Sequence, residues 1–245
     1  MHTDKIILQR EKETFTAAYC IIQENLNSLI ENCSFLHSSE KAYYDILKFD
    51  KRKHSYLLGR LAAKKAIAEL TGEKNISSIA INYGVFHFPI VKNAIHQNIQ
   101  VSITHCDDIG IALAFPEEHP LGVDIERMDE NRMEAMKSQM NATEFELITN
   151  GNIPLSVGCT AFWTIKEALS KIFRTGLTMD FKVLEINAFE QVDLASYIST
   201  YKYHAQYKAI SYAVGEYICS IVLPKNTTPV LQPFWNSLTD IANGD

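Results

Sequence analysis

Residues 162–171 read FWTIKEALSK, and their spacing predicts a helix that carries Lys166, Glu167 and Lys171 beside an apolar face. In such a helix Glu167 and Lys171 lie one turn apart on the same side, and Lys166 stands next to Glu167 around the cylinder. A solvated Glu–Lys pair contributes only about 0.2–0.5 kcal/mol to a helix. Thr164 and Glu167 also fit a capping box, in which the carboxylate has a local structural role. The segment alone leaves both interpretations open.

The composition is that of an ordinary globular protein. The chain has 245 residues, of which 47% are hydrophobic and 21% charged, enough apolar material for one large domain or two small ones. Its apolar runs all fall short of the roughly 20 residues that cross a bilayer. The start, MHTDKIILQREKE, lacks the apolar core and cleavage site of a signal peptide. We therefore expect a soluble cytoplasmic protein without a membrane partner.

The cysteines exclude two classes of site. There are five of them, an odd number, and no two are spaced as C-x-x-C. Neither a disulfide framework nor a zinc site is indicated, and we expect reduced, mostly buried thiols.

The charge is unevenly distributed along the chain. The formal net charge is −6, yet residues 41–65 contain eight Lys or Arg against two acids, so the remainder holds 15 basic and 27 acidic side chains. One basic island in an acidic protein suits a compact polyanion better than a nucleic-acid duplex, which requires a broad basic face. Each single lysine of the island is equally compatible with a solvated helix face.

The order of the predicted elements repeats. A helix is expected at residues 50–70, ending at Thr71-Gly72, and strands follow at 76–82, 99–104 and 109–115. After a break at 116–122, the second half is expected to contain a strand at 122–126, a polar helical region at 132–149, a helix at 162–173, and strands at 182–187, 202–211 and 217–223. The pattern predicts an α+β pseudo-repeat with halves at 1–117 and 118–245. The tail, 224–245, is expected to wrap around the surface.

Residues 122–126, GVDIE, alternate apolar and acidic side chains. On a strand, Asp124 and Glu126 point to one face, where they repel each other unless water or a cation lies between them. An edge strand with a solvated acidic face is one interpretation. The other is a Mg²⁺ site, since Mg²⁺ takes carboxylate oxygens together with substrate phosphates. Glu167 would then be a third ligand, and a phosphate-bearing substrate would explain Lys166 and Lys171.

Together, residues 122–126 and 163–171 (WTIKEALSK) resemble the paired signature of 4′-phosphopantetheinyl transferases, G-[VI]-D-[IV]-E with W-x-x-K-E-x-x-x-K. The length resembles the large, two-halved type typified by the surfactin-synthetase activator. Further similarities lie at residues 57–64 (LLGRLAAK), 102–106 (SITHC), 143–145 (TEF) and 174–177 (RTGL), which resemble the family's L-x-G-R, S-H-S, S-x-x-E and G-x-G-L segments.

The resemblance implies a fold, a reaction and a set of site residues. The implied fold has two similar α/β halves packed as a pseudo-dimer, with coenzyme A in the cleft between them. The implied reaction transfers the phosphopantetheine arm of coenzyme A to a serine of an apo carrier protein and releases adenosine 3′,5′-bisphosphate. Asp124, Glu126 and Glu167 would bind Mg²⁺, with Mn²⁺ also possible. A monomer that contacts an acyl or peptidyl carrier protein is expected.

The remaining roles are likewise implied by the resemblance. Glu167 would act as base, directly or through water with Glu144 in support, while Lys166 and Lys171 would stabilise charge on the leaving bisphosphate. The nucleotide end of coenzyme A would be held by the first half, through Lys41, Arg52, Arg60, Lys64, Thr104 and His105, with Lys171 as a further contact.

The chain also departs from the family pattern. His87-Phe88-Pro89 stands where the family has Gly-Lys-Pro, Thr104 and Cys106 replace serines, and Arg174 stands at a common glycine. The change at residues 87–89 leaves one alternative open, a carrier-binding protein with a decayed coenzyme site. The carboxylates leave two more: a metal-dependent phosphohydrolase that uses water as nucleophile, and a purely structural cation site.

Overall fold

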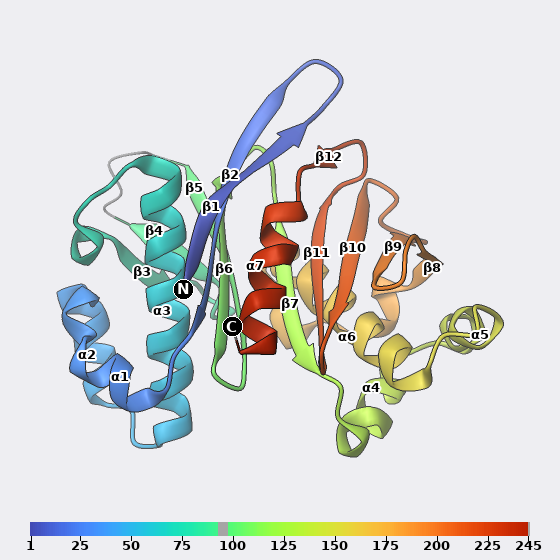
Figure 1. Cartoon of the computed structure of the whole chain (residues 1–245), viewed down its shortest axis with the longest axis horizontal. Coiled ribbons are helices and arrows are strands. Elements are labelled where there is room, and N and C mark those ends of the chain that lie inside the picture. The colour runs from blue at the N-terminus through green and yellow to red at the C-terminus, as the bar shows by residue number, and fades with distance from the viewer. Residues whose placement is uncertain (93–97, 245) are drawn as a thin grey trace. The chain divides into compact units, whose positions relative to one another are not determined.

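The computed structural model describes residues 1–92 and 98–244 and contains both helices and β-sheets, in agreement with the expected α+β class (Figure 1). The chain forms two compact units: Met1–Pro120 together with Thr228–Asp245, called unit 1, and Leu121–Thr227, called unit 2. The sequence-based division gave all of 118–245 to the second half, whereas the last segment joins unit 1. Over the described ranges, no helix is both long and apolar enough to cross a membrane.

Unit 1 is built on an antiparallel sheet with the strand order β12-β1-β2-β6-β5, and a separate hairpin β3-β4 lies next to β5. Its elements are β1 (His2–Gln9), β2 (Thr14–Gln23), α1 (Leu26–Glu31), α2 (Ser38–Asp45), α3 (Asp50–Thr71), β3 (Ala80–Tyr83), β4 (Pro89–Lys92), β5 (Ile99–Cys106), β6 (Ile109–Pro116), β12 (Thr228–Pro229) and α7 (Gln232–Asn243), with 3₁₀ turns at Cys33–Phe35 and Ile76–Ser78.

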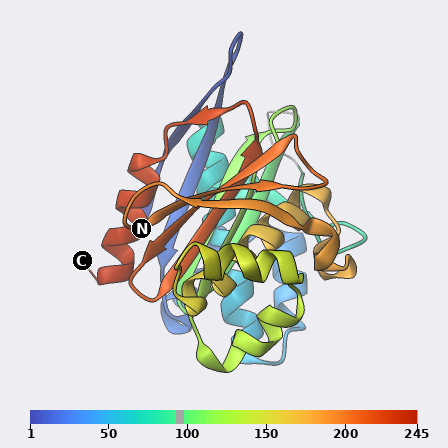
Figure 2. The same ribbon diagram turned by 90° about the vertical axis from the view of Figure 1, so that its right-hand side faces the viewer.

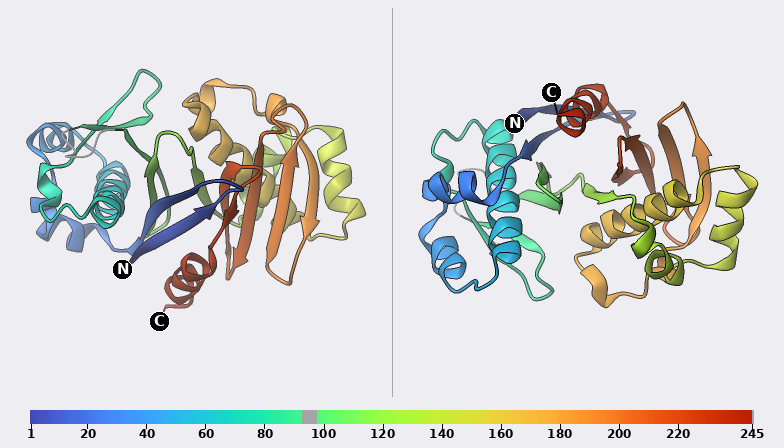
Figure 3. Two further views of the ribbon diagram at one scale, coloured as in Figure 1. Left: turned by 90° about the horizontal axis from the view of Figure 1, so that it is seen from above. Right: turned by 60° about the horizontal axis from the view of Figure 1, so that its bottom comes forward.

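The long helix α3 forms where the apolar stripe predicts it. It buries Leu57, Leu58 and Ala62 against β6, β2 and β5, and it ends at Gly72, whose φ of 78° is the left-handed cap that glycine adopts at low cost. Helices α1 and α2 lie on the side of α3 away from the sheet (Figure 1 and Figure 3). The strand expected from residue 76 begins only at β3, because Asn75 caps the preceding 3₁₀ turn through its side chain.

The chain's last segment does not wrap around the surface as a loop. Phe234, Leu238 and Ile241 recur at helical spacing and are buried in α7, which packs on β1 and β2. Tyr19 of β2 bonds to Ser237 at 3.0 Å, whereas its neighbour Cys20 belongs to the core that includes α3. Since adjacent strand residues point to opposite faces, α3 and α7 cover opposite faces of the sheet.

Unit 2 has a single antiparallel sheet in the order β7-β11-β10-β9-β8, and α6 packs on it. Helices α4 and α5 stand in the foreground of Figure 2. Its elements are β7 (Gly122–Arg127), α4 (Met133–Ser138), α5 (Ala142–Asn150), α6 (Leu155–Phe173), β8 (Ile186–Gln191), β9 (Ser196–Tyr201), β10 (Tyr207–Val214) and β11 (Tyr217–Pro224), with 3₁₀ turns at Glu130–Arg132, Gly176–Thr178 and Phe181–Leu184.

Several predicted boundaries in unit 2 were wrong. The helix expected at 162–173 begins at Leu155, directly after Pro154. The helical region expected at 132–149 is two helices, because Asn141 starts a new one as the cap of α5. The strand expected at 182–187 begins as a 3₁₀ turn, and the one expected at 202–211 starts at Tyr207, after the separate strand β9.

The two units repeat one order of elements. In unit 1 the order is β2-α1-α2-α3-β3-β4-β5-β6, and in unit 2 it is β7-α4-α5-α6-β8-β9-β10-β11. The strand neighbours correspond as well: β2-β6-β5 in unit 1 matches β7-β11-β10 in unit 2, and the hairpin β3-β4 matches β8-β9. The repeated helix-and-strand order predicted from the sequence is therefore present.

A buried Glu–Lys pair occupies the same place in each unit. In unit 1, Glu40 of α2 forms an ion pair with Lys64 of α3 at 2.6 Å and accepts the backbone N–H of His37 at 2.9 Å and of Ile81 at 3.0 Å. Lys64 also donates to the carbonyl oxygen of Phe35 at 2.9 Å. Desolvation lowers the pKa of Lys64.

In unit 2, Glu144 of α5 pairs with Lys166 of α6 at 2.8 Å and accepts the backbone N–H of Asn141 and of Ile186, both at 2.8 Å. Lys166 also donates to the carbonyl oxygen of Gln139 at 2.9 Å. The separation from glutamate to strand residue is 42 positions here and 41 in unit 1. Each pair thus joins a helix cap, the first strand of a hairpin and the long helix.

Removing the ammonium group from either pair should strongly destabilise the protein. K166M keeps most of the aliphatic stem but leaves the buried Glu144 carboxylate without its cation, which costs about 3–5 kcal/mol. K64M removes the nearer cation of Glu40 and should cost less, because Arg60 remains 3.6 Å from that carboxylate. The control is K137M, since Lys137 forms an ion pair of similar length, 2.7 Å, with the exposed Glu134, and such pairs contribute about 0–1 kcal/mol. Urea unfolding measures all three. Equal losses in K137M and K166M would contradict a structural role for the buried pair.

Candidate active site

Strand β7 presents two carboxylates on one face. Asp124 and Glu126 are two positions apart, so their side chains share that face, and Asp124 is only 5% exposed. The Lys171 ammonium donates to Asp124 Oδ1 at 2.8 Å and to the carbonyl oxygen of Val123 at 2.7 Å. Arg132 donates to Glu126 Oε1 at 3.1 Å. Both acids therefore have a basic partner.

Helix α6 brings a third carboxylate to the first two. Desolvation raises the pKa of Glu167 to about 7; the Asp124 and Glu126 charges add to this shift, and Lys171 and Arg132 oppose it. Among the described residues, Glu167 has no hydrogen-bond or ion-pair partner for its carboxylate. The three acids thus interact electrostatically across a strand and a helix, and the concentrated negative charge around Glu167 favours a cation.

The geometry allows a test of whether these acids fit a divalent metal. Carboxylate oxygens are the ligands that Mg²⁺ prefers, so the donor set fits a hard cation. However, within the described parts of the chain no group of three His, Cys, Asp or Glu side chains is arranged to hold a metal ion. The cations that balance the charges of Asp124 and Glu126 are instead Lys171 and Arg132, respectively. Metal binding by Asp124, Glu126 and Glu167 stays a prediction.

The roles expected for Lys166 and Glu144 are not supported by this geometry. Lys166 is 1% exposed, and its ammonium is engaged by Glu144 and the Gln139 carbonyl, which leaves it unable to meet a leaving phosphate. Glu144 is fully buried and accepts three hydrogen bonds, so it is poorly placed to receive a substrate proton. The capping-box interpretation of Glu144 is confirmed. We assign both residues to the frame of unit 2.

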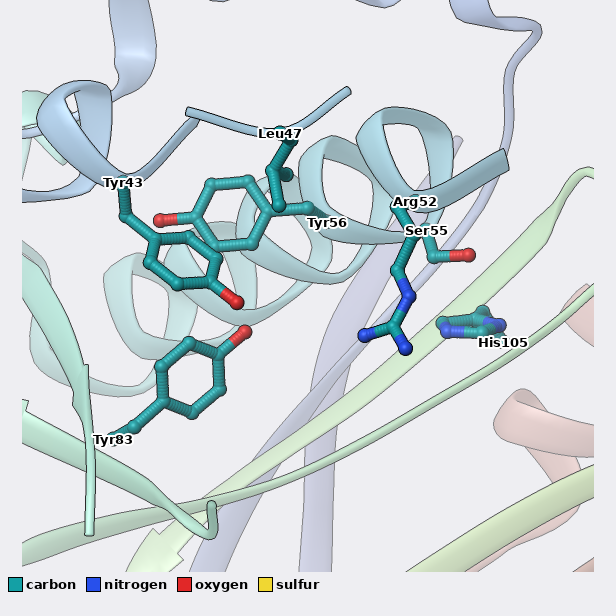
Figure 4. Close-up of a pocket in the computed structure, with 7 residues that line it drawn as sticks. All are labelled: Tyr43, Leu47, Arg52, Ser55, Tyr56, Tyr83 and His105. Carbon is teal, nitrogen blue, oxygen red and sulfur yellow. The ribbon is translucent and has the colours of Figure 1, made fainter. Parts of the chain in front are cut away.

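Unit 1 contains a pocket with a volume of about 320 Å³, within the range of small-molecule sites. Figure 4 shows the lining side chains, with the Arg52 guanidinium beside His105 and the hydroxyls of Tyr43 and Tyr83 directed toward each other. The pocket is lined by Tyr43, Leu47, Arg52, Ser55, Tyr56, Tyr83 and His105. It combines basic and aromatic groups, which suit a phosphate attached to a flat ring system.

Only some of the predicted nucleotide contacts reach this pocket. Arg52 and His105 line it together. Thr104, the neighbour of His105 on β5, is buried, and adjacent strand residues point to opposite faces. Lys41 pairs with Asp45 on the surface of α2 at 2.7 Å, and Lys64 is locked onto Glu40.

Arg60 lies behind the pocket wall. It is 4% exposed, stacks on the rings of Tyr56 and Tyr83 at 4.8 and 4.7 Å, and lies 3.6 Å from Glu40. Its charge therefore acts on the pocket through two aromatic rings rather than by direct contact. His87, in the stretch that replaces Gly-Lys-Pro, packs against the Tyr83 ring at 5.7 Å.

The tyrosines of the pocket were missed by the sequence analysis. One signal was present, since Tyr56 and Arg60 are an i, i+4 pair on a predicted helix. Desolvation raises the pKa of Tyr56 to about 12 and also raises that of Tyr83, so both remain neutral hydrogen-bonding groups at physiological pH. Tyr83 lies at the end of a hairpin strand, where no periodic pattern marks it.

Comparison with known families supports the resemblance at the level of the superfamily. Residues 120–222 match the family model described as the 4′-phosphopantetheinyl transferase superfamily. The matched region contains Asp124, Glu126, Glu167 and Lys171, and it supports a transferase of the phosphopantetheinyl type, whose substrate is coenzyme A. No curated protein matches the chain.

Glu167 predicts a pH-dependent stability difference in metal-free protein. Because its folded pKa of about 7 lies above the usual 4.5, the ionised form weakens the folded state; the penalty is absent well below 4.5 and complete above about 7. E167Q should therefore be more stable than the unsubstituted protein at about pH 8, by on the order of 2 kcal/mol, with little difference near pH 4.

Urea unfolding in EDTA across this pH range measures the effect. The control is E146Q, because Glu146 is exposed on α5. A difference between E167Q and the unsubstituted protein that does not change with pH would show that the Glu167 carboxylate is not held away from solvent near the other two acids.

Proposed function

We propose that the protein transfers the 4′-phosphopantetheine arm of coenzyme A to a serine of an apo acyl or peptidyl carrier protein and releases adenosine 3′,5′-bisphosphate. The observation that carries the proposal is that residues 120–222 match the superfamily and contain Asp124, Glu126 and Glu167, with Lys171 bonded to Asp124. The charges of Asp124 and Glu126 also act on Glu167. The large, two-halved subtype is supported by the repeated order of elements and by the Glu–Lys pair in each unit.

Unit 2 would carry the chemistry. The serine oxygen forms a bond to the β-phosphorus while the bond from that phosphorus to the bridging oxygen breaks, and the bisphosphate leaves with the bonding electrons. Glu167 is our candidate to accept the serine proton, directly or through water, because Glu144 is fully engaged elsewhere. Lys171, already positioned at Asp124, would stabilise the negative charge that grows on the leaving group.

A divalent cation completes this proposal. Asp124, Glu126 and Glu167 would hold Mg²⁺, or Mn²⁺, which when bound supplies positive charge to the pyrophosphate. Cation binding then requires the Asp124–Lys171 and Glu126–Arg132 pairs to loosen. Unit 1 would bind the nucleotide end in the tyrosine-lined pocket, where Arg52 and His105 meet a phosphate group.

The deciding experiment incubates the protein with coenzyme A, Mg²⁺ and a panel of apo carriers from fatty-acid, polyketide and peptide synthesis. Intact-mass measurement should show a gain of one phosphopantetheine on at least one carrier. E167Q and D124N should lose at least about 100-fold in turnover, because metal and base groups contribute that much to such reactions. E146Q should be unaffected. No gain on any carrier would contradict the proposal, and hydrolysis of coenzyme A without a carrier would indicate a phosphohydrolase.

The pocket in unit 1 predicts a separate effect on coenzyme affinity. R52A and H105A remove groups that contact the substrate far from the reacting phosphorus, so KM for coenzyme A should rise by about tenfold with little change in kcat. The matched control is K48A, which removes a basic residue of the same island that does not line the pocket. Initial rates at varied coenzyme A measure the split. A fall in kcat with unchanged KM would contradict a binding role for this pocket.

A further inference from the structure

Three hydroxyl groups form a chain inside unit 2. Thr164 of α6 bonds to Ser220 of β11 at 2.7 Å, and Ser220 bonds to Ser211 of β10 at 2.7 Å. All three residues are completely buried. Neither the resemblance nor the proposed chemistry gives any of them a role.

The donors and acceptors in this chain of hydroxyl groups follow from the single proton that each hydroxyl carries. Thr164 donates its one hydroxyl proton to the carbonyl oxygen of Ala161 at 2.9 Å. Its oxygen must therefore accept from Ser220, and Ser220, having used its own proton, must accept from Ser211. The donor of each hydrogen bond is thus fixed by its neighbouring bond. A shift of α6 along β11 would break this series of hydrogen bonds.

The same helix stripe carries the candidate active site. Thr164, Ala168 and Lys171 are four and then three positions apart, so they lie along one side of α6. At Ala168 the helix backbone touches the sheet, since a Cβ built on Gly122 would lie 2.0 Å from the Ala168 carbonyl oxygen. At Lys171 the ammonium reaches Asp124 and the Val123 carbonyl.

Ser220 links this stripe to the acids. In the pairing of β11 with β7, Ser220 is the direct partner of Asp124, so the two side chains share a face of the sheet. The residue that bonds to Thr164 is therefore the cross-strand neighbour of the carboxylate to which Lys171 bonds. Apolar packing is non-directional and tolerates sliding, whereas hydrogen bonds of 2.7 Å set the position of the helix along the strand.

Unit 1 supplies an internal comparison. The Glu–Lys pairs make Lys64 the counterpart of Lys166, which makes Ala62 the counterpart of Thr164, and Ala62 is also fully buried. Strand β6, the counterpart of β11, reads IGIALAFP and has no hydroxyl side chain. The counterpart of Glu167 is Lys65. In the unit without the acidic cluster, the counterpart of Thr164 is thus an alanine and the counterpart of β11 carries no hydroxyl group.

We infer that Thr164, Ser220 and Ser211 are positioning residues that set the height of α6 on the sheet, so that Glu167 and Lys171 stand opposite Asp124. Buried hydroxyls gain little net stability over apolar groups of the same shape, so their placement here is better explained by geometry than by stability. The positioning of α6 by these hydroxyls does not depend on the proposed function, whereas an effect on turnover rests on that function.

The first experiment measures positioning without activity. A double-mutant cycle of D124N and K171M, followed by urea unfolding in EDTA, gives the coupling between Asp124 and Lys171. The same cycle is then measured in the T164V background, which replaces the hydroxyl by a methyl group. The coupling should fall by more than half in T164V and return in T164S. Unchanged coupling, or no recovery in T164S, would overturn the inference. If T164V does not fold, S220A takes its place.

The control is S199A. Ser199 lies on β9 of the same sheet and is fully buried, and its hydroxyl has no hydrogen-bond partner within the described part of the chain. S199A therefore removes a buried serine hydroxyl but leaves the hydrogen bonds of Thr164, Ser220 and Ser211 intact. The Asp124–Lys171 coupling should be unchanged. A fall in coupling as large as that in S220A would show a general effect of the substitution and would overturn the inference.

The second experiment uses carrier modification. T164V and S220A should lower kcat by about 10- to 100-fold, the loss typical of reacting groups displaced by about 1 Å, while KM for coenzyme A stays within a factor of about two. T164S and S199A should retain the full rate. A normal kcat in both T164V and S220A would overturn the inference. Absence of transfer in the unsubstituted protein would refute only the proposed function, because the coupling cycle still decides the positioning role.

Discussion

The buried contact between a glutamate and a lysine, Glu144 with Lys166, is the constraint on which unit 2 depends. A charged pair away from water is tolerated only when its remaining hydrogen-bonding capacity is met, and here backbone N–H groups and a carbonyl meet it. The pair ties together α5, α6 and the start of β8. Because Glu167 follows Lys166 directly, the pair also fixes the direction in which α6 presents Glu167.

The same device in unit 1 supports a different outcome. Glu40 and Lys64 join α2, α3 and β3, and the neighbouring elements enclose a pocket rather than an acidic cluster. A second buried cation, Arg60, stands four residues before Lys64, where unit 2 has Phe162 before Lys166. Phe162 packs on Phe189, whereas Arg60 packs on Tyr56 and Tyr83. The same position on the long helix thus makes an apolar contact in unit 2, through Phe162, and places a positive charge behind the pocket in unit 1, through Arg60.

The acidic cluster of unit 2 illustrates how burial and charge act together. Three carboxylates that repel one another electrostatically are unfavourable without cations, and Lys171 and Arg132 form ion pairs with two of the three. Glu167 is left with the cost, seen as a pKa raised to about 7. Such a group has more to gain from a divalent cation than a solvated carboxylate, which links the electrostatics of the fold to the proposed chemistry.

The sequence by itself determined the α+β class, the repeated order of elements and the helix predicted at residues 50–70, because hydrophobic period and local caps are written in consecutive residues. The association of the GVDIE strand with the WTIKEALSK helix came from the family resemblance instead. The sequence could not distinguish basic residues that are solvated from those that are buried in ion pairs. Lys64 and Lys166 look like solvated helix lysines until the fold buries each against a glutamate more than 20 positions away. The pocket tyrosines and the Thr164–Ser220–Ser211 chain come from separate elements, so only tertiary structure decided that they meet. The physical reason is that burial and hydrogen-bond partners are properties of how helices and strands pack, and no local pattern encodes them.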